Sequence, residues 1–149
     1  MLELATIADW EAVKQLSVQI HDLHVNWRPD MYYHSEEPLP YDHFCDLIND
    51  KLIYVAKIDG MVAGYVALSI SNKGCDGMFL KKVMRIDSIC VDETVRGHGI
   101  GSQMAQEIWA LCRAFGCDTL ILGVHPENDR AVNFYQKCGF RIRTIHMEM

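Results

Sequence analysis

The sequence lacks the marks of several large protein classes. No apolar stretch approaches the roughly 20 residues that span a bilayer, so we expect no membrane-spanning helix. None of the six cysteines forms a C-x-x-C pair, and the seven histidines show no H-E-x-x-H spacing. These are the spacings typical of zinc-ribbon, thioredoxin-type and zinc-protease sites, and we therefore expect no metal site.

Positive charge is also scarce. Lysine and arginine number 14 against 20 aspartates and glutamates, which gives a net charge of −6. Nucleic-acid binders usually carry a basic patch, so we expect no nucleic-acid partner. The first residues, MLELATIADW, do not resemble a secretory signal, and several cysteines lie in apolar runs, as free thiols do in a reducing compartment. The chain is therefore expected to be cytoplasmic.

What is present is enough for one domain, because 149 residues can bury a substantial core. Apolar spacing and turn residues predict strands that alternate with helices, with hairpins early and β-α units late. The order indicates a mixed sheet with helices on its faces, in the α/β or α+β class. The expected strands are 2–7, 51–58, 61–71, 83–91, 119–124 and 140–149, and the expected helices are 9–27, 41–49, 102–115 and 129–138.

A glycine-rich turn joins the strand at 83–91 to the following helix. It reads Arg96-Gly-His-Gly-Ile-Gly-Ser102, and glycine allows a ligand to approach the backbone closely. The first amides of a helix have no internal partner and lie at the positive end of its dipole, so the turn is typical of a phosphate site. A P-loop would end in Gly-Lys, whereas here Gly101 is followed by Ser102, so the turn is not a P-loop. A dinucleotide-binding fingerprint would carry glycine in place of Ser102, so that motif is also disfavoured.

A second motif follows about thirty residues later, from Asn128 to Phe140. It reads N-x-x-A-x-x-F-Y-x-K-x-G-F, and the earlier turn reads R-x-x-G-x-G. Two motifs in this order resemble the GNAT superfamily of acyl-CoA-dependent N-acetyltransferases, most strongly from Ile86 to Phe140.

This resemblance implies a fold and a cofactor. The fold would be a mostly antiparallel mixed sheet of six to seven strands, splayed at strands 4 and 5, with helices on both faces and a single acetyltransferase domain over residues 1–149. The cofactor would be acetyl-CoA. Its implied contacts are the strand residues Ile89, Cys90 and Val91, the loop residues Arg96, Gly97, His98, Gly99, Ile100, Gly101 and Ser102, and Asn128 and Tyr135 at the later helix.

The resemblance also implies direct attack of an amine on the thioester in a ternary complex. Tyr135 would protonate the departing thiolate, because a tyrosine with a reference pKa of about 10 is a donor at neutral pH. Relatives often carry a glutamate where Asp87 stands, so Asp87 is a candidate base, although a salt bridge to Arg85 or a lysine is an equal alternative. Strand alternation would put Asp87, Ile89 and Val91 on one face. His125 is a second base candidate.

The acceptor would be a small-molecule amine or a peptide N-terminus, bound beside the loop at 28–42. Trp27, Tyr32 and Tyr33 are the candidate contacts, although the same residues suit an ordinary surface loop. A homodimer is expected by analogy with relatives. Two other functions stay open: a catalytically silent acyl-CoA-binding regulatory module, and a phosphate- or mononucleotide-binding protein that uses the glycine loop alone.

Overall fold

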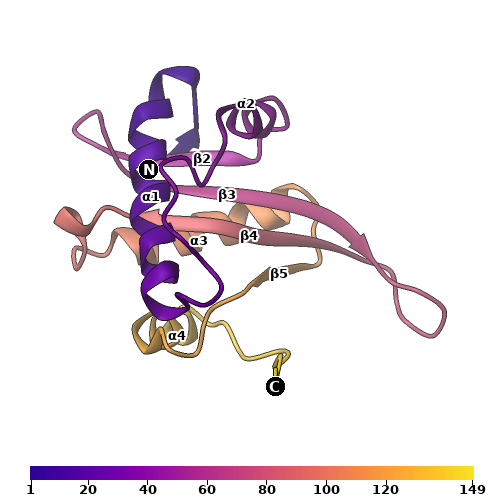
Figure 1. Cartoon of the computed structure of the whole chain (residues 1–149). Helices are drawn as coiled ribbons and strands as arrows, with labels where there is room; N and C mark the ends of the chain where they lie inside the picture. Colours follow the sequence, from indigo (N-terminus) through magenta and orange to yellow (C-terminus); the bar gives the residue numbers. More distant parts are fainter.

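Five strands form a single sheet in the order β1-β2-β3-β4-β5 in the computed structural model, which describes all 149 residues (Figure 1). Four α-helices and two short 3₁₀ turns complete the fold. None of the helices has both the length and the apolarity to cross a membrane. The strands are β1 (Leu2–Leu4), β2 (Ile53–Ile58), β3 (Met61–Lys73), β4 (Lys81–Val91) and β5 (Thr119–Leu122). The helices are α1 (Trp10–Trp27), α2 (Tyr41–Asn49), α3 (Ile100–Ala114) and α4 (Asp129–Lys137). The 3₁₀ turns are η1 (Ile7–Asp9) and η2 (Glu93–Val95).

The sheet is mixed, and its one parallel pair is short. Strands β1 to β4 pair antiparallel, whereas β4 and β5 pair in parallel. The β4–β5 ladder runs only from Val83 opposite Thr119 to Ile86 opposite Leu122. Beyond Ile86, β4 continues to Val91 with β3 as its only partner strand. The two strands therefore part at this point, where the family resemblance implies a splay.

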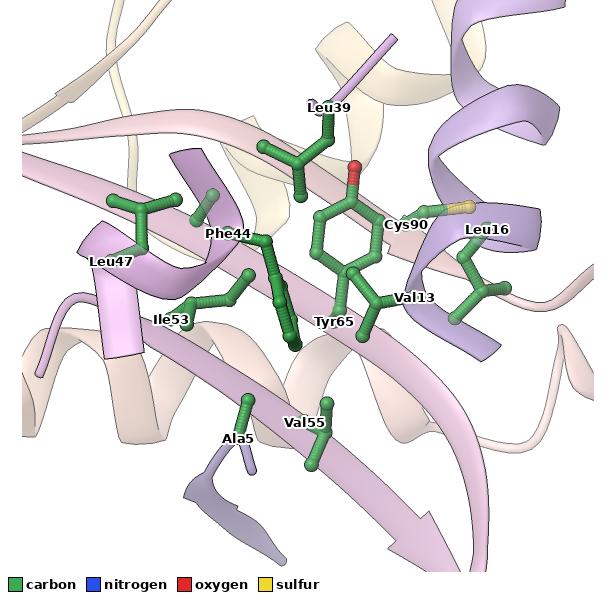
Figure 2. Close-up of a cluster of buried hydrophobic side chains, with 11 residues drawn as sticks. Ala5, Val13, Leu16, Leu39, Phe44, Leu47, Ile53, Val55, Tyr65 and Cys90 are labelled. Carbon is green, nitrogen blue, oxygen red and sulfur yellow. The ribbon is translucent and has the colours of Figure 1, made fainter. Parts of the chain in front are cut away.

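Helices cover both faces of the sheet. Helices α1 and α2 lie on one face and α3 on the other, while the long β3–β4 hairpin extends beyond them (Figure 1). Each face has its own core of 11 buried residues. Under α1 and α2, Phe44 packs beside Tyr65 and Ile53, and Val13 and Leu16 reach in from α1 (Figure 2). This packing fixes the N-terminal half of the chain against β2 and β3.

The number of strands differs from the expectation of six to seven. Residues 140–149 read as a strand in the sequence because arginine alternates with isoleucine, but they adopt no regular structure. Ile142 and Ile145 are 66% and 74% exposed, so neither side chain is buried against another part of the chain. A strand needs a partner ladder and a face to cover, and the alternating pattern supplies neither. The tail is instead held at its end, where Glu148 pairs with Arg28 at 2.7 Å.

A β-bulge in β4 also changes which residues share a face. Ala67 pairs with Ser88 but Leu68 pairs with Ile86, so Asp87 is an extra residue in the ladder. As a result Ile86 packs in the same core as Ile89 and Val91, whereas simple alternation puts it on the opposite face. A bulge depends on how two strands pair, so it could not be predicted from the sequence of β4 alone.

Asp9 stands at the N-cap position of α1, but its side chain does not cap the helix. The Asp9 carboxylate instead accepts hydrogen bonds from the backbone N–H and hydroxyl of Thr6, at 2.8 and 2.9 Å, and pairs with Lys57 at 3.0 Å. These contacts end β1 at Leu4 rather than at residue 7. Burial favours a higher pKa for Asp9, but the hydrogen bonds from Thr6 and the Lys57 ammonium hold the pKa below its ordinary value.

Candidate active site

The glycine turn at the start of α3 presents unused backbone donors. The N–H groups of residues 97–102 donate to no other group in the chain. Gly97 and Gly99 have φ values of +86° and +82°, and a Cβ built on either would meet nothing within 4 Å. Six consecutive free amides at a helix N-terminus, with open space beside them, form a site suited to a phosphate or pyrophosphate.

Two side chains of this turn contact backbone carbonyls that precede it in the chain. Arg96 donates from Nε to the Val91 carbonyl at 2.8 Å, which ties the guanidinium to the end of β4. His98 lies 3.1 Å from the Val95 carbonyl through Nδ1 and is otherwise exposed. A ligand that pairs with the Val91 carbonyl would share this oxygen with Arg96 or displace the guanidinium from it.

Cys90, next to Val91 on β4, is buried. Burial raises the pKa of this thiol to about 11, against a weaker opposing effect of Arg96. The thiol therefore stays protonated at neutral pH, and a protonated thiol is a poor nucleophile.

Helix α4 packs its aromatic residues against the start of α3. The Phe134 ring lies so close to Gly101 that a Cβ there would be 3.2 Å from the ring. Tyr135 lies between Phe134 and Phe140, with ring centroids 5.2 and 5.6 Å away. Burial, followed by the thiols of Cys138 and Cys90, raises the pKa of Tyr135 to about 12. Tyr135 is therefore a phenol at neutral pH, and a hydrogen-bond donor near the end of β4.

Asn128 begins α4. Its Oδ1 accepts a hydrogen bond from the Ala131 N–H at 3.1 Å, as helix-capping residues do. This contact uses the carbonyl oxygen and leaves the side-chain amide N–H groups without a partner in the chain.

Asp87 sits at the bulge and lies partly in solvent. Its carboxylate is 3.4 Å from Arg85 Nε, and its side chain is 42% exposed. Of the two readings that the sequence left open for Asp87, the ion pair with Arg85 is present in the structure. The candidate base role stays a prediction.

The aromatic residues expected at the acceptor loop gather into one cluster with two histidines. Rings of Trp27 and Tyr32 each lie 5.7 Å from that of His24. The His125 ring, from the segment after β5, lies 5.5 Å from His24 and 6.0 Å from Tyr32. Tyr33 does not join them, because its side chain is 84% exposed. Burial, together with His125 and His21, lowers the pKa of His24 below its ordinary value.

An open cavity of about 270 Å³ lies beside this cluster. His21 from α1 and Tyr32, Tyr33 and Glu37 from the loop form part of its lining. His21 donates from Nε2 to the Tyr33 carbonyl at 2.8 Å, which fixes the loop against α1. The sequence analysis did not single out His21 or His24 as site residues, because a histidine on an amphipathic helix gives no signal of what faces it.

No group of three or more His, Cys, Asp or Glu side chains comes together in a way that could hold a metal ion. All six cysteines are free thiols.

Comparison with known proteins identifies the class. The model of the acetyltransferase (GNAT) family matches residues 18–140, and the chain belongs to this family. The chain is similar to several proteins in it. L-amino acid N-acetyltransferase AaaT of Escherichia coli is 27% identical over 145 residues, which cover 93% of this chain and 80% of that protein.

Glucosamine 6-phosphate N-acetyltransferase of Trypanosoma brucei brucei is 29% identical over 90 residues. That match covers 60% of this chain and only 58% of the relative. Among solved structures, a mutant of the BH1408 protein of Bacillus halodurans is 29% identical, with a TM-score of 0.94, and covers 100% of this chain and 98% of that chain.

Proposed function

We propose that residues 1–149 form one acetyltransferase domain that moves an acetyl group from acetyl-CoA to a primary amine. The observation that carries this proposal is the set of six free amides at residues 97–102, at the start of α3, which follows the open end of β4 after the short turn η2. Membership of the family of acetyltransferases supports the same activity.

The cofactor's pyrophosphate fits the glycine turn. The amides of Gly97, Gly99 and Gly101 would donate to its oxygens, and the positive end of α3 favours its charge. Ile89, Cys90 and Val91 offer the edge of β4 that β5 leaves open, against which an extended arm can lie as an added strand. His98, Ile100, Ser102 and Asn128 complete the proposed contacts, together with Arg96, which would turn from the Val91 carbonyl toward a phosphate.

When bound, acetyl-CoA supplies an acetyl thioester whose carbonyl carbon accepts the amine and whose sulfur leaves. Tyr135 would donate a hydrogen bond to that sulfur as it gains charge. A backbone N–H at the parted end of β4 would stabilise the oxyanion. Direct attack of the amine is favoured over a cysteine acyl-enzyme, because Cys90 is a buried thiol whose pKa is raised to about 11.

The amine itself would enter beside α1 and the 28–42 loop. Trp27, Tyr32 and Tyr33 are the proposed contacts, since aromatic faces attract cations. Asp87 stays the base predicted from the family pattern, acting through a water molecule. A homodimer and a cytoplasmic location also stay predictions.

Isothermal titration with acetyl-CoA, repeated with ATP, tests the cofactor assignment. We expect micromolar binding of acetyl-CoA and none of ATP. ATP competing with CoA would favour a mononucleotide-binding protein, and failure of the folded protein to bind acetyl-CoA would refute the proposal.

A thiol-release assay then tests turnover. The acceptors are spermidine, a mixture of L-amino acids, glucosamine 6-phosphate and a peptide with a free N-terminus. Tight acetyl-CoA binding without thiol release from any of them would favour the catalytically silent binding module.

A further inference from the structure

Two histidines from distant parts of the chain meet at the acceptor side of the site. His24 lies in the last turn of α1, and His125 lies in the segment that follows β5. Their ring centroids are 5.5 Å apart with an interplanar angle of 64°. Trp27 and Tyr32 lie within 6.5 Å of His125, so aromatic rings from α1 and the 28–42 loop surround the pair.

The histidine pair lies between the cofactor side of the proposed site, at the end of β4, and the acceptor side, at the open cavity. His125 follows the strand that parts from β4 at Ile86, so it belongs to the segment that borders the opening. Tyr32 packs against both histidines and also lines the open cavity. Tyr32 is therefore the residue through which the cavity adjoins the histidine pair.

The surroundings of His24 favour its neutral form. His24 faces His21 on its own helix, His125 across the cluster and the Tyr32 ring on the loop. Neither His24 nor His125 forms an ion pair with a carboxylate, whereas the exposed His34 pairs with Asp22 at 2.8 Å. Burial and the neighbouring histidines lower the pKa of His24. A neutral imidazole has a free lone pair, which a base requires.

We propose that His125 is the residue that takes the proton from the acceptor ammonium, and that His24 is the positioning residue that orients its ring. This inference rests on the proposed acetyltransferase function. In the step, an N–H bond of the ammonium breaks and its electron pair stays on nitrogen. The proton forms a new N–H bond on the His125 ring. The free amine then attacks the thioester, and His125 releases the proton to water.

This arrangement competes with the base role predicted for Asp87. The Asp87 carboxylate is already paired with Arg85 and is partly exposed. His125 has aromatic neighbours and no such cation.

The test compares variants in the thiol-release assay with the most active of the four acceptors. His125→Asn should lower kcat/KM by about 100-fold, the lower end for a general base. Its rate should keep rising with pH up to the pKa of the amine, whereas the wild-type rate reaches a plateau above the histidine pKa. His24→Asn should shift that plateau and lower the rate less. Neither should change the acetyl-CoA dissociation constant, and His43→Asn, at an exposed position on α2, serves as the matched control.

The outcomes distinguish a failure of the His125 proposal from a failure of the acetyltransferase proposal. An active wild type with an unchanged rate and pH profile in His125→Asn would overturn the histidine assignment and leave the acetyltransferase proposal standing. A comparable loss in Asp87→Asn, with His125→Asn unaffected, would transfer the base to Asp87. A wild type that binds no acetyl-CoA, or binds it and acetylates none of the four amines, would overturn both proposals.

Discussion

Replacing Tyr135 with phenylalanine removes one hydroxyl from a closely packed part of the site. The ring lies between Phe134 and Phe140, so the phenylalanine ring should keep the same place. In the proposed mechanism this hydroxyl donates a hydrogen bond to the leaving sulfur. Tyr135→Phe should therefore lower the rate of the chemical step and leave acetyl-CoA affinity nearly unchanged.

The pKa of Tyr135 limits the size of this effect. A thiol has a reference pKa of about 8.5, so full proton transfer from a phenol with a pKa of about 12 is uphill by about 5 kcal/mol. Tyr135 should then act mainly by hydrogen bonding to the developing thiolate. A hydrogen bond to a charged group contributes roughly 1.5–3 kcal/mol, which corresponds to about a 10- to 150-fold fall in kcat.

The assay is a single-turnover measurement of thiol release at saturating acetyl-CoA, with the most active of the four acceptors. Tyr54→Phe, which removes a hydroxyl from β2, is the control and should retain the wild-type rate. An unchanged chemical step in Tyr135→Phe would remove the hydroxyl from the mechanism. A loss above about 1,000-fold would instead indicate full proton transfer, within the range for general acids, and would refute the argument from the pKa.

Three further substitutions test the loop, the sheet and the histidine cluster. Gly99→Val should weaken acetyl-CoA binding at least 100-fold, as measured by calorimetry. Valine disfavours a φ of +82°, and its Cβ would occupy the open space beside the amides. Wild-type affinity in the folded variant would contradict the assignment of the pyrophosphate to this loop. Gly64→Ala should lower the free energy of unfolding in urea by about 1–3 kcal/mol, since its Cβ would lie 2.8 Å from the Cys90 carbonyl oxygen, whereas Gly123→Ala, with 3.9 Å of clearance, should cost much less. His24 has a lowered folded-state pKa, so the unfolded chain binds more protons as pH falls below about 6.5, and stability should drop toward pH 5. His24→Gln should flatten that slope in denaturation curves recorded at several pH values; an unchanged slope would show that His24 does not cause it.

Features set by neighbouring residues could be predicted from the sequence. The prediction of a helix at 41–49 is confirmed at Tyr41–Asn49, and the Asp59-Gly60 turn has the two positive φ values, 51° and 79°, that a two-residue hairpin turn requires. Gly116 ends α3 with φ of +68°, as its position after the helix indicated. Each of these depends on a short stretch of chain and on backbone conformations that few residues adopt.

Features that depend on a partner strand or a distant ring could not be predicted. The bulge at Asp87 exists because β3 and β4 pair in two registers, and the tail at 140–149 lacks the ladder that its alternation suggested. His24 meets His125 across about a hundred residues of chain, and no spacing within either segment indicates that contact. Sequence patterns describe one element at a time, whereas these contacts arise between elements.

The same distinction explains why a phosphate site could be predicted from the sequence and the acceptor could not. The free amides belong to one continuous turn, whose glycines and helix start can be read directly. The acceptor side is assembled from the end of α1, the 28–42 loop and the segment after β5. The two relatives compared here are named for different amines, glucosamine 6-phosphate and L-amino acids. Relatives named for different amines are expected when the phosphate turn is local in sequence and the acceptor side is formed by tertiary contacts alone.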